Sequence, residues 1–184
     1  MQPPRLFIFA GLPGVGKTTL ARRLARDLRA ACLRIDTIEQ AMRDERVDLS
    51  GPEGYVVAYR VATDNLRLGT SVVADSVNPI GITRRAWREV ATHAEAAFVE
   101  IHVICSDVQE HRRRVESRAS DIAGHRLPTW HEVETRQFEP WDTAPIVIDT
   151  ADQAESDSFA ALQRAIEASD NQTLQRTGRA SRSS

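Results

Sequence analysis

A glycine-rich segment between an apolar strand and an amphipathic helix limits the possible folds of this chain most strongly. The run RLFIFAG (5–11) is short and almost continuously apolar, which is typical of a strand covered on both faces. GLPGVGKT (11–18) follows, and the next segment, KTTLARRLARDLRA (17–30), places leucines four residues apart, as expected for a helix. This order of strand, glycine-rich turn and helix predicts the first unit of an α/β sheet.

The remainder of the chain continues to alternate between strand and helix patterns. We expect further strands at 32–36, 70–76, 98–105 and 145–150. We expect helices at 51–69, 81–97, 107–120 and 154–169, with one or two helical turns and a loop within 37–49. The alternation predicts a three-layer α/β fold with a five-stranded, mostly parallel sheet.

The length and composition favour one folded domain. The chain has 184 residues, of which 41% are hydrophobic and 27% are charged, so it can bury a substantial core. We assign residues 1–169 to a single domain and predict that 170–184, which has no apolar period, is a flexible polar tail. The formal net charge of −2 argues against a nucleic-acid binder that relies on bulk positive charge.

Cysteine usage and hydropathy indicate the compartment we expect. Cys32 and Cys105 lie far apart and outside any C-x-x-C pair, so we expect two buried thiols in a reducing environment. No segment approaches the ~18 consecutive apolar residues that a membrane span needs, and the first residues do not resemble a cleavable signal. We therefore expect a cytoplasmic protein that does not contact a membrane.

The glycine-rich segment also predicts a phosphate site. Gly11, Gly16, Lys17 and Thr18 fit the pattern G-x-x-x-x-G-K-S/T, and Lys17 is the only lysine among the 24 Lys and Arg residues. Glycines let successive N–H groups point inward, and the following helix adds its positive end. The compact ammonium of Lys17 can bridge phosphate oxygens, and the Thr18 hydroxyl can bind Mg²⁺. The predicted nucleotide-binding loop is Gly11, Leu12, Pro13, Gly14, Val15, Gly16, Lys17, Thr18 and Thr19.

Two acidic residues follow predicted strands, where α/β proteins place their sites. Asp36 ends the second strand; it could orient an acceptor hydroxyl and take its proton, or it could cap a helix together with Glu39. Asp75 ends the third strand; it could hold Mg²⁺, it could contact the acceptor, or it could form a turn with Ser76 and Asn78.

Several classes of nucleotide-binding protein are excluded. Guanine-reading GTPases need N-K-x-D or T-K-x-D, and a chain with one lysine in its phosphate loop has neither. Their D-x-x-G segment is also missing, because Asp75 is followed by SVN. The segment LSGPE (49–53) is only superficially similar to the L-S-G-G-Q of ABC-type ATPases.

The remaining features resemble the small P-loop phosphotransferases. This group includes polynucleotide 5′-kinase, gluconate kinase, chloramphenicol phosphotransferase, zeta toxin and bacterial "AAA domain" kinases, and the resemblance spans about residues 5–168. It is carried by GLPGVGKTTLARRLA, RID, VVADSVNP, RRRVESR, LPTWHEVETRQFEPW and IDTA. It implies that Asp36 is the catalytic carboxylate and that Arg114 and Arg118, on one helix face, act from a lid spanning about 107–141. It also implies that Thr150 and Ala151 lie near the adenine of ATP.

Four further side chains have open roles. Arg84 and Arg85 could face the acceptor or lie on a helix surface. Trp130 and Trp141 could stack on a base or pack beneath a loop.

The sequence thus predicts a phosphotransferase that uses ATP and Mg²⁺ and acts on a hydroxyl of a small molecule. One alternative is a polynucleotide or RNA 5′-hydroxyl kinase, so a nucleic-acid partner is possible but not favoured, because Ile38, Glu39 and Gln40 follow Asp36 where an Arg would be expected. The other is a nucleotide-binding switch with slow hydrolysis. Segments 37–69 and 76–90 contain no motif that identifies the acceptor, and the oligomeric state stays open.

Overall fold

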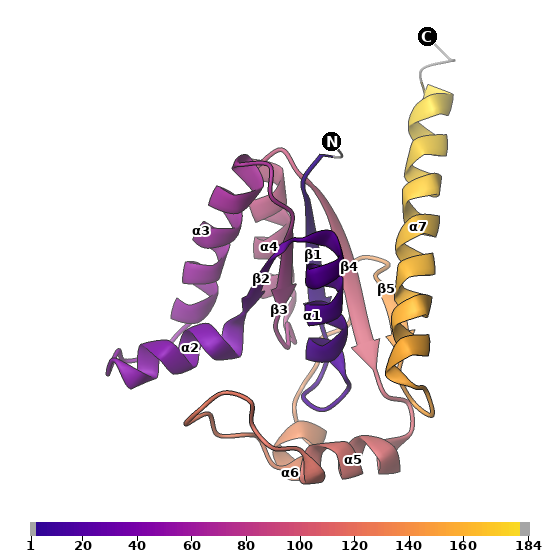
Figure 1. Ribbon diagram of the computed structural model, residues 1–184. Coiled ribbons are helices and arrows are strands. Elements are labelled where there is room, and N and C mark those ends of the chain that lie inside the picture. The colour runs from indigo at the N-terminus through magenta and orange to yellow at the C-terminus, as the bar shows by residue number, and fades with distance from the viewer. Residues whose placement is uncertain (1–2, 181–184) are drawn as a thin grey trace.

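The computed structural model describes the backbone of residues 3–180 and the side chains of residues 3–171 (Figure 1). Strand and helix alternate along this part of the chain, which confirms the predicted α/β fold. The strands are β1 (Arg5–Ala10), β2 (Ala31–Arg34), β3 (Val72–Asp75), β4 (Ala97–Ile104) and β5 (Ile146–Asp149). The helices are α1 (Lys17–Leu28), α2 (Ile35–Asp44), α3 (Glu53–Arg67), α4 (Gly81–His93), α5 (Val108–Ser117), α6 (Trp130–Glu134) and α7 (Glu155–Ala180).

The five strands form one sheet in the order β2-β3-β1-β4-β5, and every neighbouring pair is parallel. All strands therefore end at the same edge of the sheet. The loop after β1, the start of α2 after β2 and the last residue of β3 meet at this edge, which is where ligands bind in open parallel sheets.

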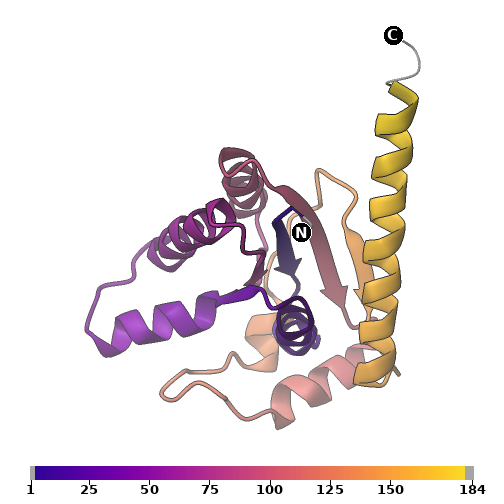
Figure 2. The same cartoon turned by 45° about the horizontal axis from the view of Figure 1, so that its top comes forward.

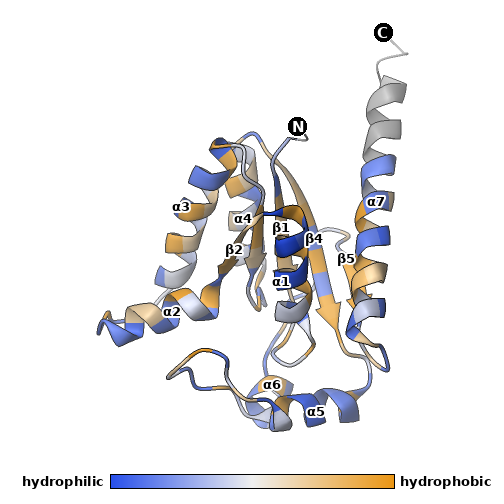
Figure 3. Ribbon diagram, viewed as in Figure 1, coloured by the Kyte–Doolittle hydropathy of each residue, from blue (hydrophilic) through white to orange (hydrophobic). Residues whose placement is uncertain are grey.

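The apolar pattern of β1 explains the three layers. Phe7 and Phe9 pack in a core with α1 and α7, whereas Leu6 and Ile8 pack on the opposite face with α3 and α4. Figures 1 and 2 show these two helix pairs on either side of the sheet. Figure 3 shows the apolar strands between helices that are more polar outside, with α5 the most uniformly hydrophilic.

Segment 107–141, the expected lid, lies beneath the carboxyl edge of the sheet (Figure 1). It contains α6, a helix that we did not predict. Thr129 and Glu132 form a capping box there, in which Glu132 Oε2 accepts from the Thr129 N–H at 2.8 Å. The pattern T-x-x-E at 129–132 is a recognised signal for a helix start and could have been used to find α6.

Three local predictions differ from the structure. Helix α2 begins at Ile35, so Asp36 lies in a first helical turn rather than at the end of a strand. Helix α7 continues to Ala180 instead of ending near 169, because no Gly or Pro interrupts residues 155–177. Residues 181–184 of the predicted tail lie outside the described residues, and the flexibility of the tail stays a prediction. Cys32 is exposed, and only Cys105 is buried.

The described helices include none that combines the length and the apolar character needed to cross a membrane.

Candidate active site

The glycine-rich loop has a backbone that only glycine tolerates at its turning points. Gly11, Gly14 and Gly16 have φ values of 144°, 90° and 86°. A Cβ at Gly11 would lie 2.3 Å from the carbonyl oxygen of Val103, and one at Gly14 would lie 2.5 Å from Val115 Cγ2. The loop is therefore held closely between β4 and α5, and its shape is determined before any ligand arrives.

Lys17, the first residue of α1, is buried against the end of β3. Its Nζ donates a hydrogen bond to Asp75 Oδ1 at 2.6 Å. Asp75 is 1% exposed, and no group among the described residues donates to its Oδ2. The alternative role of Asp75 in a turn is wrong, because its carboxylate binds Lys17, while Asn78 instead donates to the carbonyl of Phe9.

These residues fit a magnesium site of the predicted kind. Mg²⁺ prefers hard oxygen ligands and shares them with phosphates. Asp75 Oδ2 is a buried carboxylate oxygen that accepts no hydrogen bond among the described residues and has a long contact of 3.9 Å with Arg34 Nε, and Thr18 lines the same pocket as Lys17. The donor set is thus suited to Mg²⁺ that arrives with a nucleotide.

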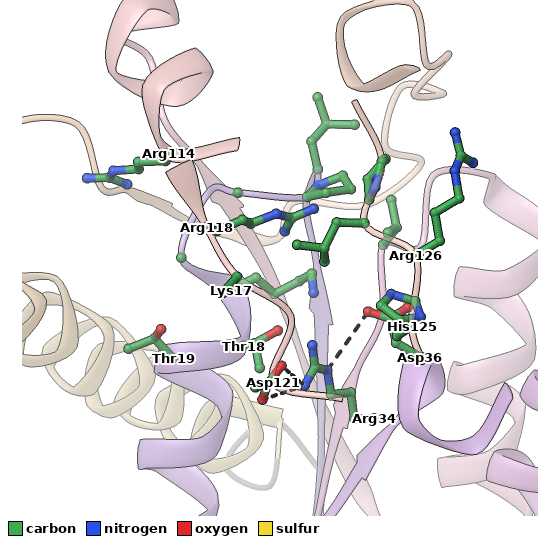
Figure 4. Close-up of a pocket in the computed structure, with 18 of the residues that line it drawn as sticks. Lys17, Thr18, Thr19, Arg34, Asp36, Arg114, Arg118, Asp121, His125 and Arg126 are labelled. Atoms are coloured by element: carbon green, nitrogen blue, oxygen red, sulfur yellow. Dashed lines mark hydrogen bonds and ion pairs between the residues drawn. The ribbon is translucent and has the colours of Figure 1, made fainter. Parts of the chain in front are cut away.

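A cavity of about 700 Å³ opens from the glycine-rich loop towards segment 107–141. Figure 4 shows Lys17 and Thr18 on one side of this cavity and Asp36 on the other, with Arg34 and Asp121 beneath them. Its size falls within the range typical of small-molecule sites. Sequence-predicted residues from three separate segments, namely the glycine-rich loop, the start of α2 and residues 114–118, therefore share one pocket.

Asp36 faces this cavity from the first turn of α2. The capping alternative is wrong, because the N-cap of α2 is Arg34 and no side chain caps the helix. The only ion pair of Asp36 among the described residues is a long contact of 3.8 Å with Arg34 Nε. The carboxylate therefore stays open to a ligand.

The two predicted lid arginines are placed differently. Helix α5 ends at Ser117 and Arg118 has extended backbone angles, so the prediction that Arg114 and Arg118 share a helix face is wrong. Arg118 enters the cavity beside Lys17 (Figure 4), and its Nε is buried without a partner among the described residues. Burial lowers its pKa, while the nearby Asp36 carboxylate opposes that shift. Arg118 thus offers an uncommitted charge to a ligand.

Arg114 also lines the cavity, but its guanidinium ties α5 to the loop after β5. Its guanidinium donates to the Oγ1 and the carbonyl oxygen of Thr150, both at 2.8 Å, and pairs with Glu110. Thr150 Oγ1 also lies 2.9 Å from the carbonyl oxygen of Val15. The side chain of Thr150 is therefore used to hold the glycine-rich loop, and Ala151 packs against the core beneath it.

The two tryptophans and Arg84 pack within the protein. The rings of Trp130 and His111 pack edge to face, with their centroids 5.2 Å apart. His111 Nε2 in turn lies 2.8 Å from the carbonyl oxygen of Pro13 in the glycine-rich loop. Trp141 lies 4.6 Å from the guanidinium of Arg84. Arg84 is completely buried, so both predicted positions for it, at the acceptor or on a surface, are wrong; Arg85 is exposed.

The bonds of Arg84 show why a charged side chain is buried there. Its guanidinium donates to the carbonyl oxygens of Asn78, Glu139 and Pro140 at 2.8 to 3.2 Å. Burial lowers its pKa, and the nearby acidic side chains, with Asp142 the first, oppose that shift. Arg84 thereby joins the loop after β3 to the end of segment 107–141, a role that no sequence pattern signals.

Sequence reasoning also missed Asp121. Its carboxylate accepts two hydrogen bonds at 2.9 Å from Arg34 and pairs with Arg22 at 2.6 Å. The bond from Arg34 is the main cause that lowers the pKa of Asp121 to about 2, with a smaller contribution from Arg22. Arg22, Arg34 and Asp121 are distant in sequence, so this contact across the cavity depends on the tertiary fold and cannot be predicted from a local pattern.

A second cavity, of about 260 Å³, adjoins the first between α2, α3 and the loop after β3. The two cavities share Asp36, Glu39, Val77 and Arg136. A molecule in the smaller cavity would therefore have Asp36 between itself and the phosphate loop.

Comparisons with known proteins agree with this fold. A family model described as "AAA domain" matches residues 6–137. A comparison with curated protein sequences gives no match.

Three solved structures illustrate the shared architecture. A predicted kinase from Chloroflexus aurantiacus is 24% identical with a TM-score of 0.69, over 91% of this chain and 98% of that one. Mycobacterium tuberculosis APS kinase, in complex with AMPPNP and APS, is 18% identical with a TM-score of 0.66, over 91% and 99%. A gluconokinase from Sinorhizobium meliloti is 14% identical with a TM-score of 0.64, over 95% and 99%. The chain therefore has the fold of P-loop kinases.

Proposed function

This chain belongs to the AAA domain family, and from that premise we propose that it transfers the γ-phosphoryl group of Mg·ATP to a hydroxyl of a small molecule. One observation carries the proposal: a single cavity is lined by the phosphate loop with Lys17 on one side and by the open carboxylate of Asp36 on the other. Phosphoryl transfer needs this arrangement, because donor phosphate and acceptor hydroxyl must be held close together.

The donor side would use residues that are already preorganised. Lys17 and the N–H groups of the loop would bind the β- and γ-phosphates, and Thr18 and Asp75 would hold Mg²⁺. When bound, Mg²⁺ would neutralise charge on the phosphate oxygens. Arg118, which lines the cavity and whose buried Nε has no hydrogen-bond partner among the described residues, would stabilise the charge that spreads over the transferred group.

The acceptor side would use Asp36. The acceptor oxygen forms a bond to the γ-phosphorus while the bond to the β–γ bridging oxygen breaks, so that ADP leaves. Asp36 would orient the hydroxyl and receive its proton. A chain with 24% identity to a predicted kinase and the same fold as APS kinase and gluconokinase is consistent with this reaction, and an acceptor hydroxyl is our inference from Asp36.

The experiment measures ADP release with Mg·ATP across metabolites, nucleosides and 5′-hydroxyl oligonucleotides. We expect a small molecule to raise turnover, and we expect Asp36→Asn to lower that stimulated rate by about 10²–10⁴-fold, the usual contribution of a general base. Asp48→Asn, an exposed change of the same kind in the loop after α2, is the matched control and should leave the rate unchanged.

Each other outcome contradicts the proposal in a different way. Stimulation by oligonucleotides alone would favour a polynucleotide kinase, for which Arg34 and Arg118 beside Asp36 would then supply the basic groove. ATP binding with no acceptor that raises turnover would favour a nucleotide switch. An unchanged rate in Asp36→Asn would remove the catalytic role of that residue.

A further inference from the structure

Both apolar and charged side chains line the smaller cavity. The apolar side chains are Ile35 on α2 and Val77, Pro79 and Ile80 in the loop after β3. Asp36 and Glu39 of α2 also line the cavity with their carboxylates, and Tyr55 and Thr83 add polar atoms. Such a lining suits a compact molecule with a hydrocarbon framework and a few polar groups.

The charges that face this cavity are unequal. Asp36 and Glu39 are three residues apart on α2 and so lie on the same helix face. Among the described residues, Arg136 is the only cationic residue that lines the smaller cavity. Arg136 is exposed and also lines the larger cavity. Two carboxylates therefore face one peripheral guanidinium.

The other arginines near these carboxylates, which are Arg34, Arg43 and Arg118, do not line the smaller cavity. Arg43 binds Glu39 Oε2 at 3.0 Å, but its side chain is 46% exposed and does not line the cavity. Arg34 lies 3.8 Å from Asp36, and its guanidinium makes its two short hydrogen bonds, each 2.9 Å, to Asp121. No hydrogen bond between described residues uses Glu39 Oε1, so this oxygen can accept one from a ligand.

We propose, building on the proposed function, that the acceptor is an amino alcohol whose hydroxyl faces Asp36 and whose ammonium group binds Glu39. A charge-assisted hydrogen bond to a half-buried carboxylate favours the ammonium group. A phosphate ester in the same cavity would place its negative charge against two carboxylates, which disfavours it. Glu39 thereby favours acceptors with an ammonium group and disfavours acceptors with a phosphate group.

Matched acceptors test this selectivity directly. ADP release with Mg·ATP is measured for serinol, glycerol and glycerol 3-phosphate, and for glucosamine, glucose and glucose 6-phosphate. We expect the amine in each set to have a kcat/KM at least about tenfold above that of the phosphate ester, equivalent to one well-placed charge contact. A phosphate ester that is preferred in both sets would overturn the proposal.

Two variants, for which we expect opposite changes in KM, identify the charged residue that determines the preference for an amine over a phosphate ester. Glu39→Gln should raise the KM for the amine about tenfold and reduce the discrimination against its phosphate ester. Arg136→Gln should lower the KM for the amine, because it removes a repelling cation. Glu45→Gln, an exposed change of the same kind at the end of α2, is the matched control. A larger loss in Arg136→Gln than in Glu39→Gln would contradict the proposal.

A binding measurement separates this inference from the phosphotransfer reaction. Ligand-observed NMR with Mg²⁺ and a non-hydrolysable ATP analogue detects acceptors without turnover. If no alcohol is phosphorylated although Mg·ATP binds, the proposed function fails, but binding of serinol or glucosamine that is lost in Glu39→Gln still supports the charge selectivity. Stronger binding of the phosphate esters, or binding of neither amine at millimolar concentration, would overturn it.

Discussion

The two ends of the cavity are built in different ways. The phosphate side consists of residues 11–19 with Asp75, and most of it is one continuous segment whose shape is imposed by three glycines. The acceptor side, formed by Asp36, Glu39, residues 77–80 and Arg136, comes from three separate segments. A contiguous motif determines its own geometry, whereas a surface assembled from distant segments depends on everything that positions them. Substitutions on the phosphate side should therefore change mainly the affinity for Mg·ATP, whereas substitutions on the acceptor side should change mainly the KM for the acceptor.

The largest effect is expected for Lys17 on the phosphate side. Lys17→Met removes the phosphate-binding ammonium and leaves the buried carboxylate of Asp75 without its 2.6 Å partner. We expect Mg·ATP affinity, measured by calorimetry, to fall more than about 100-fold, and the free energy of unfolding to fall by about 3–5 kcal/mol.

Two further variants separate these effects. Adding Asp75→Asn to Lys17→Met should recover stability but not binding, because no buried charge is then left unpaired. Arg26→Met, on the exposed face of α1, is the control and should change neither quantity. Full Mg·ATP affinity in Lys17→Met would remove the basis of the proposed function.

A smaller effect, on the other side of the comparison, is expected for Arg84. Arg84→Met leaves three carbonyl oxygens without their donor, and we expect the free energy of unfolding, from urea titration, to fall by about 3 kcal/mol. Because Arg84 joins the loop after β3 to residues 139–140, the KM for the acceptor should rise more than the dissociation constant of Mg·ATP.

The neighbouring arginine provides the control for that experiment. Arg85→Met, an exposed change one residue away, should be nearly neutral. Arg84→Lys should not restore stability, since a compact ammonium lacks the planar fork with which the guanidinium reaches the separate carbonyl oxygens and lies over the Trp141 ring. Equal losses in the two Met variants would show that the buried guanidinium does not organise the acceptor side.

The smallest effect is expected for Asp121, the contact that crosses the cavity. Its pKa in the folded protein, about 2, is below the usual 3.8, so its ionised form adds stability above about pH 4 that disappears as the pH falls towards 2. Because its side chain is 47% exposed, solvent screening should limit this contribution to at most about 1 kcal/mol.

Asp121→Asn should lower the thermal midpoint only slightly, but should speed trypsin cleavage at Arg126 in the adjacent loop. The comparison protein is Asp27→Asn, an exposed change on α1. Cleavage at the same rate in both variants would mean that the Asp121 contact does not restrain segment 107–141.

Much of the phosphate side could be predicted because its residues act locally. The spacing of Gly11, Gly16 and Lys17 implies the loop, and the ends of parallel strands bring Asp75 to it. Asp36 also lies at the predicted edge, although it belongs to a helix rather than to a strand. Arg114 and Arg118, four residues apart in an arginine-rich segment, could not be separated in sequence. Both line the cavity, but α5 ends at Ser117, so Arg114 bonds to Thr150 from the helix whereas Arg118 has extended backbone angles and keeps its Nε free of a hydrogen-bond partner among the described residues.

Arg84 and Asp121 were beyond prediction for a different reason. An arginine in a charged chain is usually a surface residue, and only the carbonyl groups and aromatic rings of residues 138–141 make a buried one tolerable. Asp121 obtains its low pKa mainly from Arg34 and to a smaller extent from Arg22, and both are distant from it in the chain.

The amino-acid sequence by itself determined the parallel α/β fold and the phosphate loop, since periodicity and glycine spacing act over a few residues. Only the tertiary structure decided the acceptor side, where separate segments meet and the balance of charge around Glu39 and Arg136 is set. The physical reason is that backbone conformation is a local property, whereas burial and electrostatic partners are properties of the packed molecule.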